Sequence, residues 1–80
     1  MNGLRIYTRT ELASSTQTEA VFYTRRGSGP YYRWGYDEGL AVWRPSRLSA
    51  ADLMTQSFDQ ARWKSIPSSL KSRLNEHYLE

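Results

Sequence analysis

The segment from residue 25 to residue 44 concentrates the side chains that are best suited to binding. It holds four arginines, three tyrosines and two tryptophans around two glycine-containing turns. An arginine guanidinium makes forked contacts with phosphate or carboxylate and stacks on flat rings. Aromatic side chains stack on exposed nucleic-acid bases and also form the hot spots of protein interfaces. The chemistry that this segment indicates is recognition of an anionic partner.

The residues that could carry catalysis are few and isolated. His77 is the single histidine, and the chain contains no cysteine. General acid–base and metal chemistry both need a second positioned group, and the sequence shows none for His77. Asp37 and Glu38 are adjacent carboxylates, but they lie in a predicted turn, where acidic residues are common. We therefore expect no enzymatic activity, no metal site and no cofactor.

The motif RRGSGP, residues 25–30, is a predicted hairpin turn with two flanking arginines. Its glycines allow a positive φ, and Pro30 closes the turn. The backbone N–H groups of such a turn can also hold an anion. Because the motif lacks the spacing and the Lys-Ser/Thr ending of a phosphate-binding loop, it predicts a turn rather than a nucleotide site.

Four strands are predicted to carry these side chains. Residues 4–9 alternate apolar and polar side chains, and three later segments are rich in β-branched and aromatic residues. The predicted strands are 4–9, 20–26, 31–36 and 40–44, with Pro45 ending the last one. The polar segment 10–19 lacks apolar periodicity and is predicted to be a flexible loop.

The turn residues predict which strand residues share a face of the sheet. A three-residue hairpin loop at 37–39 pairs Tyr36 with Leu40, and the preceding hairpin places Tyr23 opposite Trp34. The predicted core face contains Val21, Tyr23, Trp34, Tyr36, Leu40 and Val42. The opposite, basic-aromatic face contains Phe22, Arg26, Tyr31, Arg33 and Trp43. A slip of one residue in either turn exchanges the two sets.

After residue 45 the hydrophobic period becomes helical. The side chains at helical spacing are Leu53, Met54, Phe58 and Ala61 in a first segment, and Leu70, Leu74 and Tyr78 in a second. Ser49 is the predicted cap of the first helix, with Asp52 three residues later, and Pro67 suits the first turn of the second helix. The predicted fold is therefore one α+β domain. It consists of an antiparallel β-meander of three to four strands and two short C-terminal helices packed on one sheet face.

Size and charge narrow the class of protein further. The 80 residues carry a net charge of +3, and residues 1–47 hold seven arginines against four acidic residues. We expect a cytoplasmic protein, because small secreted domains usually contain disulfides. No stretch approaches the roughly 20 apolar residues of a membrane span, so no membrane contact is expected. Leu79 and Glu80 resemble a cloning scar, and we assign them no function.

These features predict a small non-catalytic binding module whose specific role the sequence does not name. Its basic-aromatic sheet face is expected to contact a protein or another anionic partner. The predicted partner-binding residues are Phe22, Arg25, Arg26, Tyr31, Arg33, Trp43 and Arg44, with Trp63 and Lys64 as a secondary contact. Two alternatives stay open. One is a domain that binds single-stranded RNA or DNA; the other is an accessory subunit or homodimer that buries this face permanently.

Overall fold

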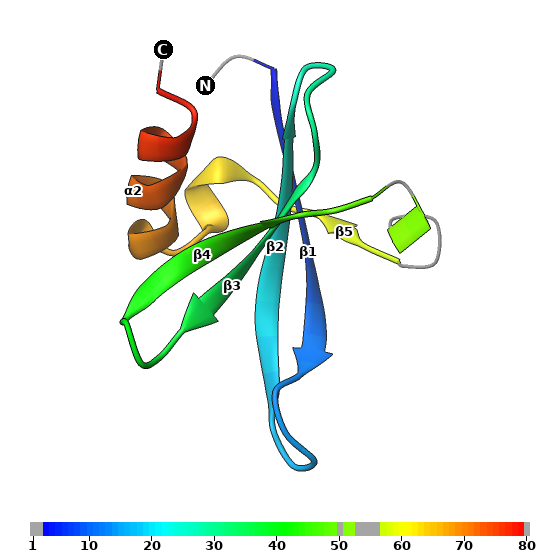
Figure 1. The fold of residues 1–80 in the computed structure, drawn as a ribbon, viewed down its shortest axis with the longest axis vertical. Coiled ribbons are helices and arrows are strands. Elements are labelled where there is room, and N and C mark those ends of the chain that lie inside the picture. The colour runs from blue at the N-terminus through cyan, green and yellow to red at the C-terminus, as the bar shows by residue number, and fades with distance from the viewer. Residues whose placement is uncertain (1–2, 50, 53–56, 80) are drawn as a thin grey trace.

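An antiparallel sheet of five strands forms the frame of the protein, in the order β4-β3-β2-β1-β5 (Figure 1). The computed structural model describes residues 3–49, 51–52 and 57–79. The strands are β1 (Leu4–Leu12), β2 (Thr18–Arg26), β3 (Tyr32–Asp37), β4 (Val42–Arg47) and β5 (Asp59–Gln60). A 3-10 helix, η1 (Trp63–Ser65), and an α-helix, α2 (Ser68–His77), follow. The predicted α+β class and antiparallel sheet are confirmed, but the sheet has five strands rather than three to four, and the described residues contain one complete α-helix instead of two.

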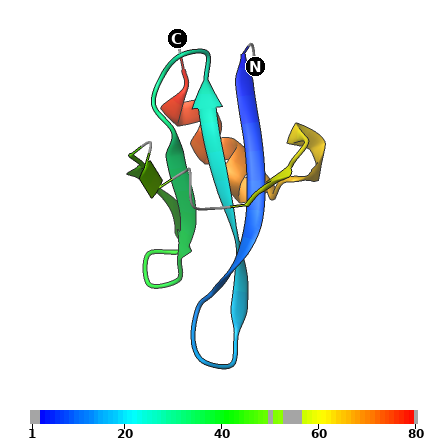
Figure 2. The same cartoon turned by 90° about the vertical axis from the view of Figure 1, so that its right-hand side faces the viewer.

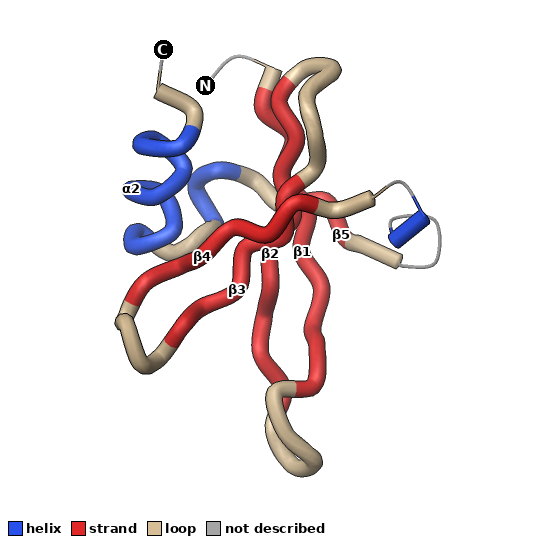
Figure 3. The backbone as a smooth tube through the Cα atoms, in the orientation of Figure 1, coloured by secondary structure: helices blue, strands red, loops and turns tan. Residues whose placement is uncertain are grey.

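The first two strands form a long hairpin that projects beyond the rest of the sheet (Figure 3). Its register joins Leu4 to Arg26 at one end and Leu12 to Thr18 at the other. The predicted loop over 10–19 is therefore too long, because both strands continue into it. Most side chains at this end of the hairpin are exposed. Hence no alternation of apolar and polar residues marks the segment as a strand.

The turn between β3 and β4 has four residues rather than the predicted three. Asp37 pairs with Val42, and residues 38–41 connect them. Ala41 adopts a left-handed φ of 53°, and the Asp37 Oδ1 accepts a hydrogen bond from the Leu40 N–H at 3.0 Å. The predicted three-residue loop assumed a glycine in the left-handed position, but Ala41 takes that conformation two residues further on.

This register moves aromatic residues between the predicted faces. Phe22 lies opposite Trp34, and Trp43 lies opposite Tyr36, so these four side chains share one face. The predicted pairing of Tyr23 with Trp34 is wrong by one residue. Because an odd shift sends every side chain to the other face, Phe22 and Trp43 belong to the core and not to a basic-aromatic surface.

Pro45 lies inside β4 rather than ending the strand as predicted. It pairs with Trp34, and β4 continues to Arg47. Proline has no N–H for a ladder hydrogen bond, so it is tolerated in strands chiefly at the edge of a sheet. The outer position of β4 meets that condition.

The predicted first helix is wrong from residue 57 onward. Its cap is present, since the Asp52 N–H donates to Ser49 Oγ at 3.2 Å and residues 51–52 are helical. Leu53 and Met54 lie outside the described residues. Phe58 then contacts Tyr23 on one face of the sheet, whereas Ala61 packs against the core cluster on the other. These two residues have helical spacing in the sequence, but they lie on an extended segment that crosses the edge of the sheet.

Helix α2 lies over one face of the sheet, which we call the helix face, and η1 lies beside the edge of β1 (Figure 2). The buried core on this face consists of Ile6, Phe22, Trp34, Trp43, Ile66, Leu70 and Leu74. Alternation along the strands sends the intervening side chains to the opposite face. We call it the arginine face, because it carries Arg5, Arg9, Arg25 and Arg33.

Hydrogen bonds to buried indoles fix both ends of α2 on the helix face. The Trp34 Nε1–H donates to Thr24 Oγ1 at 2.9 Å, and that hydroxyl lies 2.7 Å from the hydroxyl of Tyr78. At the other end of the helix, the Trp43 Nε1–H donates to Ser69 Oγ at 2.9 Å. Because the polar atoms of Trp34 and Trp43 are satisfied within the fold, these rings need no external partner.

Candidate binding surface

Cross-strand pairing brings two arginines side by side on the arginine face. Arg5 of β1 lies directly opposite Arg25 of β2. The Arg25 guanidinium carbon lies 5.0 Å from the centre of the Tyr31 ring, a cation–π contact. Its Nε also donates to the carbonyl of Gly29 at 2.9 Å. We call Arg5, Arg25 and Tyr31 the arginine row.

Within the part of the chain that the structure describes, the arginine row has no internal counter-charge. Among the described residues, no carboxylate forms an ion pair with Arg5 or Arg25. Like charges that lie directly opposite each other on neighbouring strands are destabilising. Arg25 is instead held in place by a backbone carbonyl and an aromatic ring, neither of which neutralises its charge. The row is thus a partly exposed cationic site in which Arg25 is held in place, and an anion bound there would relieve repulsion.

Two neighbouring arginines of the same face share the carboxylate of Glu11. The Glu11 carboxylate accepts hydrogen bonds from Arg33 Nη2 at 2.7 Å, from Arg9 Nε at 3.0 Å and from the Tyr23 hydroxyl. These partners, Arg33 first, lower the pKa of Glu11 from its ordinary value of 4.5 to about 2. Arg33, a predicted partner-binding residue, therefore belongs to an internal ion cluster.

The other predicted site residues are dispersed rather than gathered on one surface. Phe22 and Trp43 are only 8% and 7% exposed beneath α2. Arg26 lies on the helix face, where its Nη1 donates to the carbonyl of Tyr78 at 2.9 Å. Arg44 forms an exposed ion pair with Asp37 at 3.3 Å. Arg25 and Tyr31 are the two members of the predicted set that contact each other on the arginine face.

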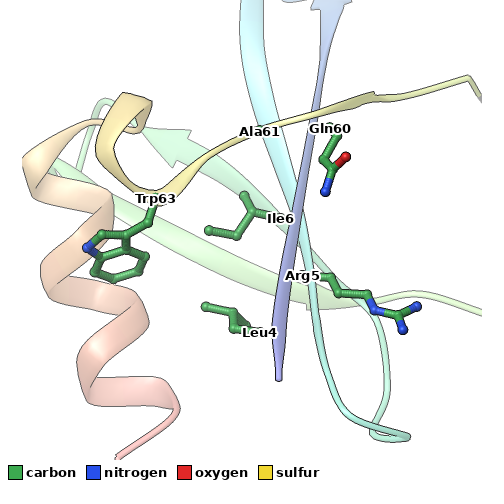
Figure 4. A pocket seen from close by; sticks show the side chains of 6 residues that line it. All are labelled: Leu4, Arg5, Ile6, Gln60, Ala61 and Trp63. Carbon is green, nitrogen blue, oxygen red and sulfur yellow. The ribbon is translucent and has the colours of Figure 1, made fainter. Parts of the chain in front are cut away.

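The secondary contact residues lie in η1, beside the outer edge of β1. The Trp63 side chain is 36% exposed and forms one wall of a notch of about 150 Å³ (Figure 4). The other residues that line this notch are Leu4, Arg5, Ile6, Gln60 and Ala61. Lys64 is exposed on the same short helix but does not line the notch. Arg5 therefore belongs both to the arginine row and to the notch.

Sequence reasoning did not select Arg5, which the structure places in the arginine row. The period of residues 4–9 does place Arg5, Tyr7 and Arg9 on the polar side of their strand. That signal could have found Arg5 only together with the pairing of β1 and β2, which brings Arg25 opposite to it. The signal was present in the alternation, but the strand that pairs with residues 4–9 and the register of that pairing were not predicted.

Comparisons with known proteins add no family to this description. The chain matches no protein-family model, and neither the curated proteins nor the solved structures contain a significant match to it. Within the described ranges, no group of three or more acidic, histidine or cysteine side chains is arranged to hold a metal ion. No helix in the described part of the chain is long and apolar enough to cross a membrane.

Proposed function

We propose that this protein is a non-catalytic binding module that binds an acidic segment of a partner protein through the arginine row. The observation that carries this proposal is the pair formed by Arg5 and Arg25. The two residues are direct partners in the β1–β2 ladder, on the same face of the sheet, and no carboxylate of the described chain forms an ion pair with either of them. A partner carboxylate that bridges the pair would replace a repulsion with two charge-assisted hydrogen bonds.

Because the aromatic rings of the sheet are covered, binding of a protein partner is better supported than binding of single-stranded nucleic acid. Proteins that bind single strands without base pairing need exposed ring faces on which bases stack. Here Trp34 and Trp43 are buried under α2, and Phe58 packs on Tyr23 with ring centres 4.6 Å apart. The Tyr31 ring is in contact with the Arg25 guanidinium. The arginine row thus offers charge and forked donors more than it offers a stacking platform.

The alternative in which another subunit permanently buries the aromatic residues is less well supported. Two of the aromatic residues that such a subunit would cover, Phe22 and Trp43, are already buried in the core that α2 of the same chain completes. The exposed end of the arginine face is cationic, and a second copy of the same surface would add to the repulsion. An acidic partner of different sequence fits this surface better.

The test is a titration with a blocked glutamate decapeptide, followed by isothermal calorimetry and by ¹⁵N-HSQC spectra. At low ionic strength we expect binding that weakens with added salt, because exposed charges are screened over about 10 Å at 0.1 M. Arg5→Glu should weaken this binding at least tenfold. Arg47→Glu is the matched control, since it makes the same charge change at an exposed position on β4.

Two results would contradict the proposal. One is equal binding by the Arg5→Glu and Arg47→Glu variants, which would reduce the effect to net charge. The other is tighter binding of a single-stranded RNA decamer than of the glutamate peptide, with shifts at Tyr31 and its neighbours. The second result would make nucleic acid the leading ligand class.

A further inference from the structure

The outer edge of β1 is only partly covered by β5. The two strands pair at Tyr7–Gln60 and Thr8–Asp59, and the Ala61 N–H donates to the Ile6 carbonyl at 2.9 Å. After Ala61 the chain leaves the edge to form η1. In the described residues, no strand continues alongside Leu4.

The register shows which backbone groups of β1 are left open there. The Gly27 N–H donates to the carbonyl of Gly3 at 3.1 Å, so Gly3 faces β2. Backbone groups alternate in direction along an antiparallel strand. Leu4 therefore directs its N–H and its carbonyl toward the outer edge, as Ile6 directs the carbonyl that Ala61 uses. One donor and one acceptor are available beside the notch.

The notch presents different chemistry on the two sides of this edge. The side chains of Leu4, Ile6 and Trp63 lie on one side of β1, and those of Arg5 and Gln60 lie on the other (Figure 4). An extended segment that is paired with β1 would send alternate side chains to these two sides. One side would meet an indole and two aliphatic chains, and the other would meet a guanidinium.

We infer that the edge of β1 at residues 4–6 binds an extended, acidic segment of the partner by strand addition. The segment places an apolar side chain against Trp63 and a carboxylate against Arg5, and its backbone pairs with Leu4. This inference rests on the proposed function and specifies its mode of recognition. Main-chain hydrogen bonds provide affinity in such complexes, while pockets for alternate side chains provide specificity.

Charge complementarity identifies the occupant as an acidic segment rather than a second copy of this chain. Antiparallel self-pairing centred on this edge would bring Arg5 of each copy together, and like charges in that position are destabilising. The other outer strand is less suited to strand addition. Pro45 interrupts its row of donors, and proline on an edge is a feature that discourages pairing.

The experiment uses a blocked octapeptide that alternates glutamate and leucine, together with two N-methylated analogues. In one analogue every leucine amide is methylated, and in the other every glutamate amide. All amides of one residue type point to the same edge of an extended strand. Strand addition therefore predicts that one analogue loses binding at least tenfold while the other retains it.

Two protein-side readouts accompany the peptides. The Leu4 N–H should exchange with solvent at least about tenfold more slowly in the complex, because it gains a hydrogen-bond partner. The indole signal of Trp63 should shift, while those of Trp34 and Trp43 stay in place because Thr24 and Ser69 hold them. Trp63→Ala should weaken binding about fivefold or more. Leu40→Ser, a change at an exposed apolar residue in the β3–β4 turn, should not.

The outcomes separate this inference from the proposed function. If both methylated analogues bind as well as the parent peptide and Arg5→Glu still abolishes binding, the cationic surface stands and strand addition is wrong. If Arg5→Glu binds the parent peptide normally, both proposals fail. If the protein self-associates and the peptide dissociates it, a second copy occupies the edge, and the acidic partner is the wrong occupant.

Discussion

The two faces of the sheet use similar residue types for opposite purposes. On the helix face, the indole N–H groups of Trp34 and Trp43 are satisfied by Thr24 and Ser69. On the arginine face, the single carboxylate of Glu11 pairs with both Arg9 and Arg33, whereas the arginine row has no counter-charge among the described residues. Composition alone does not distinguish these roles. The difference lies in whether each polar group finds a partner within the chain.

The largest expected effect tests the helix face as the source of stability. Trp34 is fully buried, and its indole donates to Thr24. Replacing a buried large side chain with alanine typically costs 3–5 kcal/mol, so Trp34→Ala should lower the free energy of unfolding by about 4 kcal/mol. Trp63→Ala, at the partly exposed notch, should cost less than about 1 kcal/mol. Urea denaturation measures both changes, and similar losses would show that the core is not where the structure puts it.

The second prediction concerns the ion cluster of the arginine face. A lowered pKa means that the folded state favours the ionised carboxylate of Glu11. The resulting stabilisation is complete above pH 4.5 and is lost as the pH falls toward about 2. Glu11→Gln should therefore cost about 1–2 kcal/mol at neutral pH, allowing for solvent screening of a partly exposed cluster. It should also flatten the acid limb of the stability curve.

Glu19→Gln provides the control for this measurement. Glu19 lies directly opposite Glu11 in the β1–β2 ladder but makes none of the described ion pairs. Its replacement removes a like charge opposite Glu11, so it should stabilise the fold slightly, by less than about 0.5 kcal/mol. An unchanged pH dependence in Glu11→Gln would show that the ion cluster does not stabilise the folded state.

The sequence was sufficient to predict the class of fold and its last helix. Period-two segments indicated antiparallel strands, and the spacing of Leu70 and Leu74 predicted the buried side of α2, where both residues are fully buried. It did not predict the register, because faces depend on whether a turn contains an odd or even number of residues. Nor did it separate Phe58 from Ala61, whose spacing suits a helix but whose contacts lie on opposite faces.

The sequence predicted the kind of candidate surface, but it did not predict which residues form it. An arginine-rich sheet face with aromatic contacts was expected, and Arg25 and Tyr31 do contact each other there. The predicted Phe22 and Trp43 are core residues, because the register places them opposite Trp34 and Tyr36. Arg5 lies on the other strand of the β1–β2 hairpin, so its place beside Arg25 depends on pairing that no local motif records.

The third prediction tests the turn that sets this register. Ala41 has a φ of 53°, where glycine is favoured over residues with a Cβ. Ala41→Gly should raise the free energy of unfolding by about 0.5–1 kcal/mol. The indole signals of Trp34 and Trp43 should keep their positions, because the pairing does not change. Destabilisation, or a change in those signals, would indicate that the turn does not adopt the left-handed conformation that gives each face its side chains.

The substitution with the smallest expected effect on stability gives the clearest contrast between the arginine face and the helix face. Arg5→Glu replaces a like-charge pair with an attractive one opposite Arg25, so it should stabilise the fold by about 0.5 kcal/mol. The same change should abolish binding of the glutamate peptide. Replacing a core residue should reduce both stability and binding. Replacing a residue that serves binding should instead raise stability while it reduces binding. Thermal unfolding and calorimetry on the same sample measure this contrast. A destabilised Arg5→Glu variant would mean that the arginine row contributes to the fold itself.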